Sequence, residues 1–316
     1  MKAVAVSQFK ATPEVMELPK PALRPGTVLV RVAGAGINPF DWKTTDGILD
    51  GKMPHQFPLI MGNDAAGTIE AVGEGVTRFQ EGDDIYGQFL HAPVGEGAFA
   101  EYAIVPEKVT ISRAPKKISM VEAAAIPTAG MTAQQIVEKS GLKHEQTLLL
   151  VGATGGVGSF VIQLAVMQGI YVIATVSDEE GAARVTALGA KETINYKKLS
   201  VAQQVKSKYP DGVDGLIDLA SHADVFKAMT ALVKIGGAAL TTNFVADENA
   251  LKERKLTGGN FEMKSSVTSL DALTDAVNNG LLQVVIEKVI SLEDVPEAIA
   301  LSRQAKSKGK TVIKIS

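Results

Sequence analysis

Four apolar runs alternate with helical segments in the middle of the chain. The runs are rich in aliphatic and β-branched residues and predict buried strands at residues 147–151, 171–176, 213–219 and 237–242. The spacing of apolar positions predicts a helix over residues 158–168 and a second helix that contains Arg184 and ends at Gly189. Strands that alternate with helices are typical of a doubly wound parallel sheet. We therefore expect this part of the chain to form an α/β domain.

The residues before this region follow a different pattern, in which short strands are separated by turn signals. Residues 27–32 and 67–72 are strand-like runs, and the second is closed by Gly73-Glu74-Gly75. Small β-rich, barrel-like domains have this pattern. The segment from residue 270 to 316 returns to mixed helix and strand, and it ends in a predicted strand over residues 311–315.

The change between these two patterns falls near Ser119. Glu122 follows Ser119 at the spacing of a capping box, in which the serine and glutamate side chains satisfy free N–H groups at a helix N-terminus. The sequence therefore predicts that a helix begins here and opens the α/β region.

One stretch without charged residues, residues 157–176, is about as long as a membrane-spanning helix. It follows a run of glycines, contains Gln163 and Gln168, and is interrupted by Gly169. A buried helix followed by a strand accounts for it better than a membrane span does. The first residues, 1–8, have the pattern of a strand and not of a signal peptide. We therefore expect a cytoplasmic protein without a membrane partner.

The amino-acid composition excludes several kinds of chemical site but says little about the fold. Hydrophobic residues make up 46% of the chain and charged residues 21%, as in ordinary globular proteins. The net charge of -3 provides no basic surface for nucleic acid. The absence of cysteine excludes disulfides, thiol nucleophiles and every zinc site with cysteine ligands. The four histidines are scattered along the chain, so we expect no metal site.

The first of the four strands runs into a glycine-rich turn with the properties of a dinucleotide-binding site. Aligned on Gly155 and Gly158, the pattern G-x-G-x-x-G places its first glycine at Ala153, and the chain has Gly152 instead. The physical requirement is still met, because such a turn lets the backbone approach a pyrophosphate and the following helix supplies free N–H groups. The expected contacts come from Gly152, Thr154, Gly155, Gly156, Val157 and Gly158. The alternative is a structural loop that binds nothing.

The end of the second strand bears on the choice between NAD and NADP. Ser177 stands where an NAD site would have an acidic residue, and its small neutral side chain leaves room for a 2′-phosphate. Arg184 and Tyr196 are candidate partners of that phosphate. A shift of one residue would instead make Asp178 the acid of an NAD site. The sequence therefore favours NADPH, with NADH as the alternative.

Six further motifs occur in order along the chain: GINPFD at 36–41, GNDAAG at 62–67, GDDIYG at 82–87, GAFAEY at 97–102, LGA at 188–190 and GKTV at 309–312. Together with the glycine turn, they make the chain resemble the zinc-independent quinone oxidoreductase and enone (alkenal) reductase branch of the medium-chain dehydrogenase/reductase superfamily. The resemblance implies a GroES-like β-rich barrel domain over residues 1–120 and 265–316. It implies a Rossmann domain with a doubly wound parallel sheet over residues 121–264, and a homodimer.

The resemblance also bears on the reaction. Zinc-dependent alcohol dehydrogenases of this superfamily have a cysteine where Asn38 stands and Gly-His-Glu where this chain has Gly62-Asn63-Asp64. Alcohol oxidation is difficult without a Lewis acid, whereas a quinone or an α,β-unsaturated carbonyl accepts hydride readily. The expected function is therefore NADPH-dependent reduction of such a substrate by direct hydride transfer. The alternatives are an alcohol dehydrogenase with an unusual metal site and an NADP-binding protein of this fold with little catalysis.

Positions that match the branch supply three candidate catalytic residues. Asn38 matches an asparagine near the nicotinamide ribose and substrate, and the alternative is a turn residue before Pro39. Asp41 would either orient this loop or, as we favour, cap a helix that begins there. Lys43 matches a lysine of plant-type enone reductases, where a cation would stabilise an enolate oxygen. The alternative for Lys43 is a solvated surface lysine.

Two further residues match positions near the cofactor. Thr132 is expected near the nicotinamide, and Asn243 near its carboxamide. One departure from the family pattern concerns Gly181, because relatives that prefer NADPH often have a lysine there. The 2′-phosphate would then depend on Ser177 and its two candidate partners.

Overall fold

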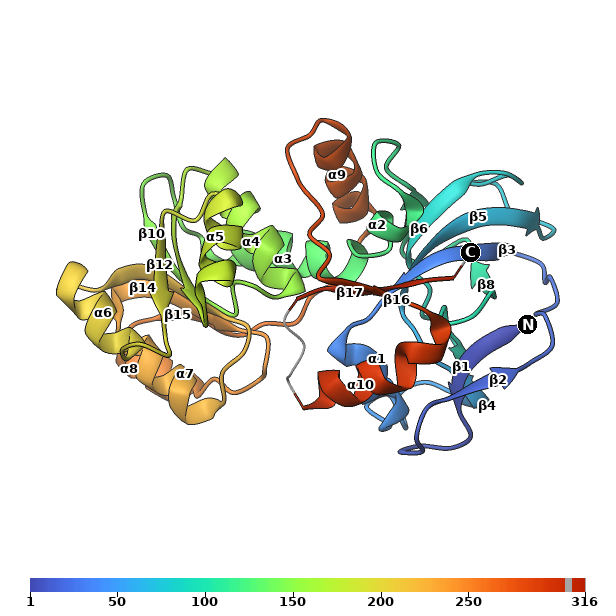
Figure 1. Ribbon diagram of the computed structural model, residues 1–316, viewed down its shortest axis with the longest axis horizontal. Helices are drawn as coiled ribbons and strands as arrows, with labels where there is room; N and C mark the ends of the chain where they lie inside the picture. Colours follow the sequence, from blue (N-terminus) through green and yellow to red (C-terminus); the bar gives the residue numbers. More distant parts are fainter. Residues whose placement is uncertain (305–308, 316) are drawn as a thin grey trace. The chain divides into compact units, whose positions relative to one another are not determined.

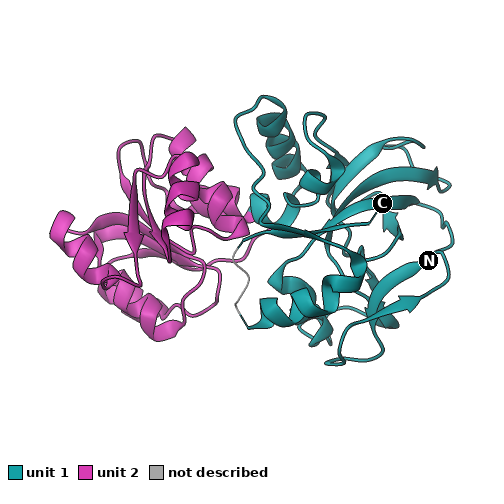
Figure 2. Ribbon diagram, viewed as in Figure 1, with its two compact units in different colours: residues 1–131, 265–316 teal, residues 132–264 magenta. Residues whose placement is uncertain are grey.

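The computed structural model describes residues 1–304 and 309–315. The chain separates into two compact units, residues 1–131 with 265–316 and residues 132–264 (Figure 2). The first unit extends beyond the expected boundary after residue 120, because α2 (Met120–Ala123) packs against strands β3 and β5 of that unit. The predicted domain end at residue 316 lies outside the described residues.

Two β-sheets make up most of the first unit. The smaller has strand order β2-β1-β4-β7, and the larger has order β16-β17-β3-β5-β6-β9 with β8 also paired to β3. The strands are β1 (Lys2–Val6), β2 (Glu14–Glu17), β3 (Thr27–Gly36), β4 (His55–Ile60), β5 (Asp64–Val72), β6 (Asp84–Gln88), β7 (Val94–Glu96), β8 (Tyr102–Pro106), β9 (Ile111–Arg113), β16 (Lys288–Ile290) and β17 (Thr311–Lys314). The helices are α1 (Pro39–Thr45), α2, α9 (Val267–Asn278), the 3-10 turn η1 (Leu292–Asp294) and α10 (Val295–Arg303).

The larger sheet joins the two ends of the chain. Strand β17 pairs antiparallel with β3, so that Ile313 lies opposite Ala35. Strand β3 is longer than the predicted strand over residues 27–32, because its last residues are small and give no apolar signal. They are small for a reason of packing, since a Cβ on Gly36 would lie 2.3 Å from the backbone oxygen of Ala124. The residue that follows α2 therefore lies close against the end of β3, where the start of β17 is paired.

The second unit is the predicted doubly wound parallel sheet. Its six strands have the order β12-β11-β10-β13-β14-β15, and every pair is parallel. The strands are β10 (Thr147–Val151), β11 (Tyr171–Val176), β12 (Glu192–Asn195), β13 (Val213–Asp218), β14 (Val233–Thr241) and β15 (Thr257–Asn260). The helices are α4 (Gly156–Met167), α5 (Glu179–Ala187), α6 (Val201–Lys208), α7 (Ala223–Thr230) and α8 (Glu248–Glu253), and α3 (Pro127–Ser140) enters from the first unit. The four predicted strands and both predicted helices of this region are therefore confirmed within a few residues at their ends.

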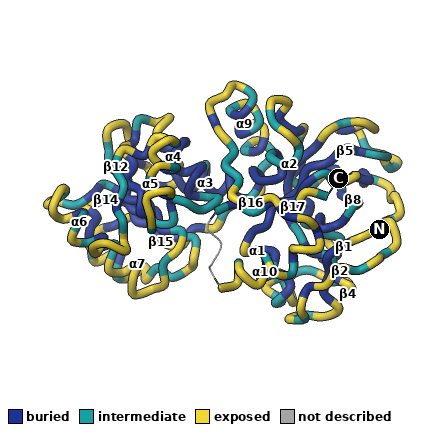
Figure 3. Tube along the Cα trace, in the orientation of Figure 1, coloured by how far each residue is buried: buried dark blue, intermediate teal, exposed yellow. Residues whose placement is uncertain are grey.

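Helices cover both faces of this sheet. Helices α4 and α5 lie on one side of it and α6, α7 and α8 on the other (Figure 1). One apolar cluster joins the second group of helices to the sheet and includes Phe226 of α7, Leu251 of α8 and Leu149 of β10. The central strands β10, β11 and β13 are buried along most of their length, and exposed residues gather on the outer helices (Figure 3). A parallel sheet covered in this way explains why its central strands β10, β11 and β13 are mostly apolar.

The strand order contains one point at which the direction of winding reverses. The chain passes from β10 outward to β11 and β12, returns to β13 beside β10, and then continues to β14 and β15. The loops that follow β10 and β13 therefore leave toward opposite sides, and ligands of such sheets bind in the resulting crevice. The glycine turn follows β10 directly, and a Cβ on Gly152 would lie 3.1 Å from Cβ of Leu219 in the loop after β13.

No helix among the described residues is long and apolar enough to cross a membrane. The charge-free stretch at residues 157–176 forms most of α4, the turn at Gly169 and strand β11, as predicted. Its apolar character is explained by burial against the parallel sheet.

Candidate active site

The glycine turn of the second unit leaves backbone N–H groups available at the start of a helix. Gly152 adopts φ +82°, a conformation that favours glycine, and turns the chain sharply after β10. Gly155 is the N-cap of α4 with extended backbone, and its carbonyl accepts from the N–H of Ser159. The N–H groups of the first helical turn have no partner within an α-helix. The residues that carry them, Gly156 and Val157, are half-buried and not enclosed, so the turn fits an anionic pyrophosphate.

Gly158 is required by packing inside the turn. A Cβ at this position would lie 2.4 Å from the oxygen of Gly152 and 2.6 Å from that of Ala153. Both atoms belong to the backbone, so the turn or the helix would have to move. Gly158 therefore lets α4 begin close to the turn.

The candidate 2′-phosphate residues lie at the ends of β11 and β12. Val176 and Asn195 are partners in the parallel register, so the next residues, Ser177 and Tyr196, follow adjacent strand ends. Ser177 is half-buried and Tyr196 is exposed, and both are reachable from solvent. Arg184 lies further along α5 and is half-buried.

Asp178 is used as a helix cap. Its Oδ1 accepts from the N–H of Gly181 at 2.7 Å, which makes it the N-cap of α5. Its Oδ2 accepts from the Ser177 hydroxyl at 2.8 Å. Both carboxylate oxygens therefore have protein partners, although the residue itself is exposed.

Asn243 and Thr132, the two other candidate cofactor residues, lie on different elements of the second unit. Asn243 follows β14, and its Nδ2 donates to the oxygen of Ser221 at 3.1 Å, in the loop after β13. Asn243 is thus at the carboxyl edge of the sheet, as is the glycine turn. Thr132 is buried within α3.

In the first unit, the loop between β3 and α1 brings Asn38 and Asp41 together. Asn38 is the N-cap of α1, and Pro39 occupies the first helical turn, where its missing N–H costs nothing. Asp41 is the third helical residue and caps the start of α1 as the acidic member of a capping box, which agrees with the favoured capping role, although the helix begins at Pro39 and not at Asp41. Its Oδ2 accepts from the N–H of Asn38 at 2.7 Å, and its Oδ1 accepts from the N–H of Asn63 at 3.0 Å. Asp41 therefore orients two backbone segments.

The side chain of Asn38 is held on both ends by buried charged groups. Its Oδ1 accepts from Nζ of Lys310 at 2.8 Å, and its Nδ2 donates to Oδ2 of Asp64 at 2.8 Å. The remaining hydrogen of Nδ2 faces the oxygen of Gly36 at 3.3 Å. With a residue exposure of 6%, Asn38 has its carboxamide turned into the protein.

Asp64 is the centre of this network. It is fully buried, and its four hydrogen bonds come from Nδ2 of Asn38, Nδ2 of Asn63, and the N–H and hydroxyl of Thr128. Nζ of Lys310 lies 3.9 Å from Oδ2 of Asp64. One buried cation thus faces two buried carboxyl groups, Asp41 and Asp64.

This arrangement shifts the protonation of the acids upward. Burial raises the pKa of Asp41 to about 7; the hydrogen bond from the Asn38 N–H opposes the rise, the charge of Asp64 adds to it and that of Lys310 reduces it. Burial also raises the pKa of Asp64, against the charge of Lys310 and the bonds from Thr128 and Asn38. Burial lowers the pKa of the Lys310 ammonium, and the two acids oppose that shift. With a proton on Asp41, the negative charge of Asp64 and the positive charge of Lys310 would cancel, and the three buried groups together would be neutral.

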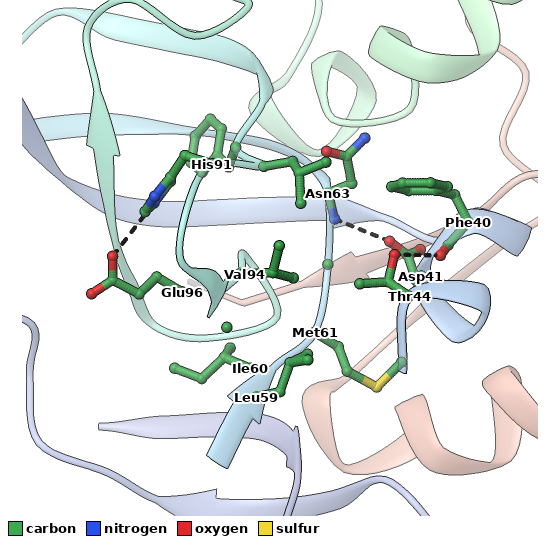
Figure 4. A pocket seen from close by; sticks show the side chains of 15 residues that line it. Phe40, Asp41, Thr44, Leu59, Ile60, Met61, Asn63, His91, Val94 and Glu96 are labelled. Carbon is green, nitrogen blue, oxygen red and sulfur yellow. Dashed lines mark hydrogen bonds and ion pairs between the residues drawn. The ribbon is translucent and has the colours of Figure 1, made fainter. Parts of the chain in front are cut away.

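A small cavity lies beside this network within the first unit (Figure 4). Its volume is about 20 Å³. It is lined by apolar side chains of Phe40, Leu59, Met61, Phe89, Leu90 and Val94 and by the polar side chains of Asp41, Thr44, Asn63, His91 and Glu96. The cavity therefore places Asn63 at the boundary between the buried network and a space that a ligand group can enter.

Lys43 lies on α1, half-buried, with Nζ 5.6 Å from the ring centroid of Trp42. Among residues 1–304 and 309–315, Nζ has neither a hydrogen bond nor an ion pair. An ammonium group without a committed anionic partner is available to a developing negative charge.

Comparison with known proteins identifies the family. Residues 24–116 match the family "Alcohol dehydrogenase GroES-like domain", and residues 156–285 match the family "Zinc-binding dehydrogenase". The quinone-oxidoreductase QR1 of Triphysaria versicolor is 30% identical over 312 residues, which cover 94% of this chain and 92% of that protein. The chain belongs to the medium-chain dehydrogenase/reductase superfamily, in its quinone oxidoreductase branch.

Other relatives agree with this assignment. The chloroplast envelope quinone oxidoreductase homolog of Arabidopsis thaliana is 36% identical over 190 residues, and the chain spans 56% of the length of that relative. The solved structure of the quinone oxidoreductase from Coxiella burnetii has a TM-score of 0.87 at 27% identity and covers 100% of this chain and 99% of its own. The resemblance drawn from the motifs and the fold class are therefore confirmed. As a member of this superfamily, the chain is an oxidoreductase that uses a nicotinamide cofactor.

Sequence reasoning missed Lys310, Thr128 and the role of Asp64 as a centre. Lys310 was visible only as part of the GKTV motif, and its partners stand at the other end of the chain. A usable signal was the pair of acidic residues, Asp41 and Asp64, in two otherwise apolar and glycine-rich motifs. Two buried acids require a buried cation or shared protons.

Proposed function

We propose that the protein reduces quinones or α,β-unsaturated carbonyl compounds with NADPH by direct hydride transfer without zinc. The single observation that carries the proposal is the Asn38–Asp64–Lys310 network, in which Asn38 stands where zinc-dependent members of the superfamily have a cysteine and Asp64 belongs to the segment where they have Gly-His-Glu. The substrates are those that accept hydride without a Lewis acid. Homodimerisation and a cytoplasmic location remain predictions.

The residues at this position do not fit a catalytic zinc ion. Zinc prefers thiolate, imidazole or carboxylate ligands in a closed set. Here the carboxamides of Asn38 and Asn63 stand at two of the positions, and the Lys310 ammonium is bonded to Asn38 at 2.8 Å. An added cation would be repelled by Lys310. Over the described parts of the chain, no three His, Asp or Glu side chains are grouped as metal ligands.

The nicotinamide cofactor fits the second unit. Gly152, Gly155 and the first N–H groups of α4 would hold its pyrophosphate, and Ser177 with Tyr196 would face the 2′-phosphate. The preference for NADPH is supported by the small neutral side chain of Ser177 at the end of β11, while the neighbouring Asp178 carboxylate caps α5 and accepts from the Ser177 hydroxyl. The bound cofactor supplies the hydride. The chain supplies positioning and the Lys43 charge near a developing oxyanion.

The test is oxidation of NADPH, followed by absorbance, with a panel of quinones and enones and with primary alcohols plus NADP as the opposite direction. We expect NADPH oxidation with at least one quinone or enone and a lower kcat/KM with NADH. Metal analysis of the same preparation is the control. Alcohol oxidation with stoichiometric zinc would replace the proposal by the dehydrogenase alternative, and cofactor binding without any turnover would replace it by a binding protein.

Lys43 provides a prediction within this function. We expect Lys43→Met to lower kcat at least about tenfold for enones with an unchanged Kd for NADPH, because the charge acts on the oxyanion and not on the cofactor. Stopped-flow turnover and cofactor titration measure the two quantities. Lys52→Met, which removes an exposed lysine from the segment after α1, is the matched control. Unchanged kcat in Lys43→Met would make Lys43 an ordinary surface residue.

A further inference from the structure

The carboxamide oxygen of Asn63 is a buried acceptor without a partner. Asn63 is 5% exposed, and its Nδ2 donates to Oδ1 of Asp64 at 3.2 Å and to Oγ1 of Thr128 at 3.2 Å. Its Oδ1 has no hydrogen bond to any residue that the structure describes. Leaving a buried acceptor unpaired costs about 1–3 kcal/mol. A ligand with an N–H or O–H group would remove this cost.

The orientation of this carboxamide is determined by its neighbours. The Thr128 hydroxyl donates its own proton to Oδ1 of Asp64 at 2.6 Å, so toward Asn63 it can only accept. An ionised Asp64 also only accepts. Turning the carboxamide over would place its oxygen against these two acceptors. The oxygen therefore faces away from the network, and Figure 4 shows it on the side of His91.

The cavity beside Asn63 has room for a small donor group. Its volume of about 20 Å³ holds one hydroxyl group or one water molecule and no aromatic ring. The remaining polar side chains that line it are engaged elsewhere: the Thr44 hydroxyl with the oxygen of Phe40, Asp41 with two backbone N–H groups, Glu96 with Arg24, and Nε2 of His91 with the oxygen of Ile104. Among the described lining residues, Oδ1 of Asn63 is the buried side-chain oxygen that has no hydrogen bond at all.

We propose that Asn63 is a substrate-recognition residue whose Oδ1 accepts a hydrogen bond from a hydroxyl group on the quinone or enone. The inference rests on the proposed function and narrows its substrate class to carbonyl acceptors that carry a hydroxyl substituent. A buried acceptor discriminates strongly against an analogue without the donor, because the acceptor then stays desolvated and unpaired. An ordered water in the cavity is the competing source of the same O–H group.

The experiment compares two benzoquinones, one with a hydroxymethyl and one with a methoxymethyl substituent. With the wild-type protein and NADPH, we expect kcat/KM to be at least about tenfold higher for the hydroxymethyl compound. Asn63→Leu should abolish this preference, and Met61→Leu, a change of apolar lining in the same cavity, should retain it. Equal kcat/KM for the two quinones in the wild type would overturn the inference, whether or not the Asn63 variant folds. An equal fall in kcat/KM for both quinones in Asn63→Leu would also overturn the inference, and would indicate that a bound water donates to Oδ1 of Asn63.

A binding measurement separates this inference from the proposed function. Calorimetric titration of each quinone into the protein without NADPH should give a Kd at least about tenfold lower for the hydroxymethyl compound, and Asn63→Leu should remove the difference. Tight and selective binding without NADPH oxidation would sustain the subsite and refute the reductase function. Turnover of unsubstituted quinones with no selectivity in either assay would support the reductase function and refute the subsite.

Discussion

Gly158→Ala is expected to weaken NADPH binding by about tenfold or more and to lower the free energy of unfolding. The added Cβ would lie 2.4 Å and 2.6 Å from two backbone oxygens, so the N-terminus of α4 must move away from the turn. Overpacking of this kind costs about 1–3 kcal/mol, against a gain of at most about 1 kcal/mol from replacing a helical glycine. Cofactor titration by fluorescence and urea unfolding measure the two effects.

Gly155→Ala is the matched comparison for this prediction. Gly155 has φ -74° and ψ 170°, which any residue adopts, and a Cβ there would meet only the oxygen of Gly152, at 3.3 Å. The fold should tolerate the change. If the pyrophosphate approaches the backbone at this point, Gly155→Ala weakens NADPH binding without changing the free energy of unfolding. Wild-type NADPH affinity in both variants would show that the turn is only structural.

The Rossmann unit was more predictable than the first unit for a physical reason. Its central strands are buried on both faces, so they form continuous apolar runs, and Gly155 and Gly158 meet backbone atoms within a few positions of themselves. A Cβ on Gly158 would meet the oxygen of Gly152 across one turn, so the local sequence is enough to predict this packing. Strand β3 was predicted too short, because Gly34 and Gly36 are small for contacts with α2 that the local pattern does not contain.

The candidate site of the first unit depends on residues far apart in the chain. Asn38 was selected by its match to the family, whereas its partners Lys310 and Asp64 come from distant segments of the chain, and no local spacing predicts their meeting. Asp41 caps α1 as expected, but its second contact is equally non-local. Its carboxylate bonds to the N–H of Asn63 as well as to that of Asn38, so its position serves a tertiary contact as much as the start of α1.

Lys310→Met is expected to lower the free energy of unfolding by about 3–5 kcal/mol, the usual cost of breaking a buried ion pair. Lys310 is 5% exposed, and its removal leaves Asp41 and Asp64 without a compensating cation. Lys2→Met is the control, because Lys2 pairs with Glu293 at 2.8 Å on the surface, where solvent screens the interaction. Urea unfolding of the three proteins compares the buried pair with the exposed one. If Lys310→Met lowers the free energy of unfolding no more than Lys2→Met does, the charge of Lys310 does not stabilise the buried network.

The loss in Lys310→Met should also grow with pH. In the folded protein the pKa of Asp41 is raised from 3.8 to about 7, so between these values the folded state holds a proton that the unfolded chain has released. The contribution of this group to stability is therefore present at low pH and is lost as pH rises through about 7. Lys310 lowers the pKa of Asp41, so without it the pKa rises further and the decline extends to higher pH. The difference between wild type and Lys310→Met should be larger at about pH 8 than at about pH 6, whereas Lys2→Met should show no such trend. An equal difference at both pH values would place the proton elsewhere than on Asp41.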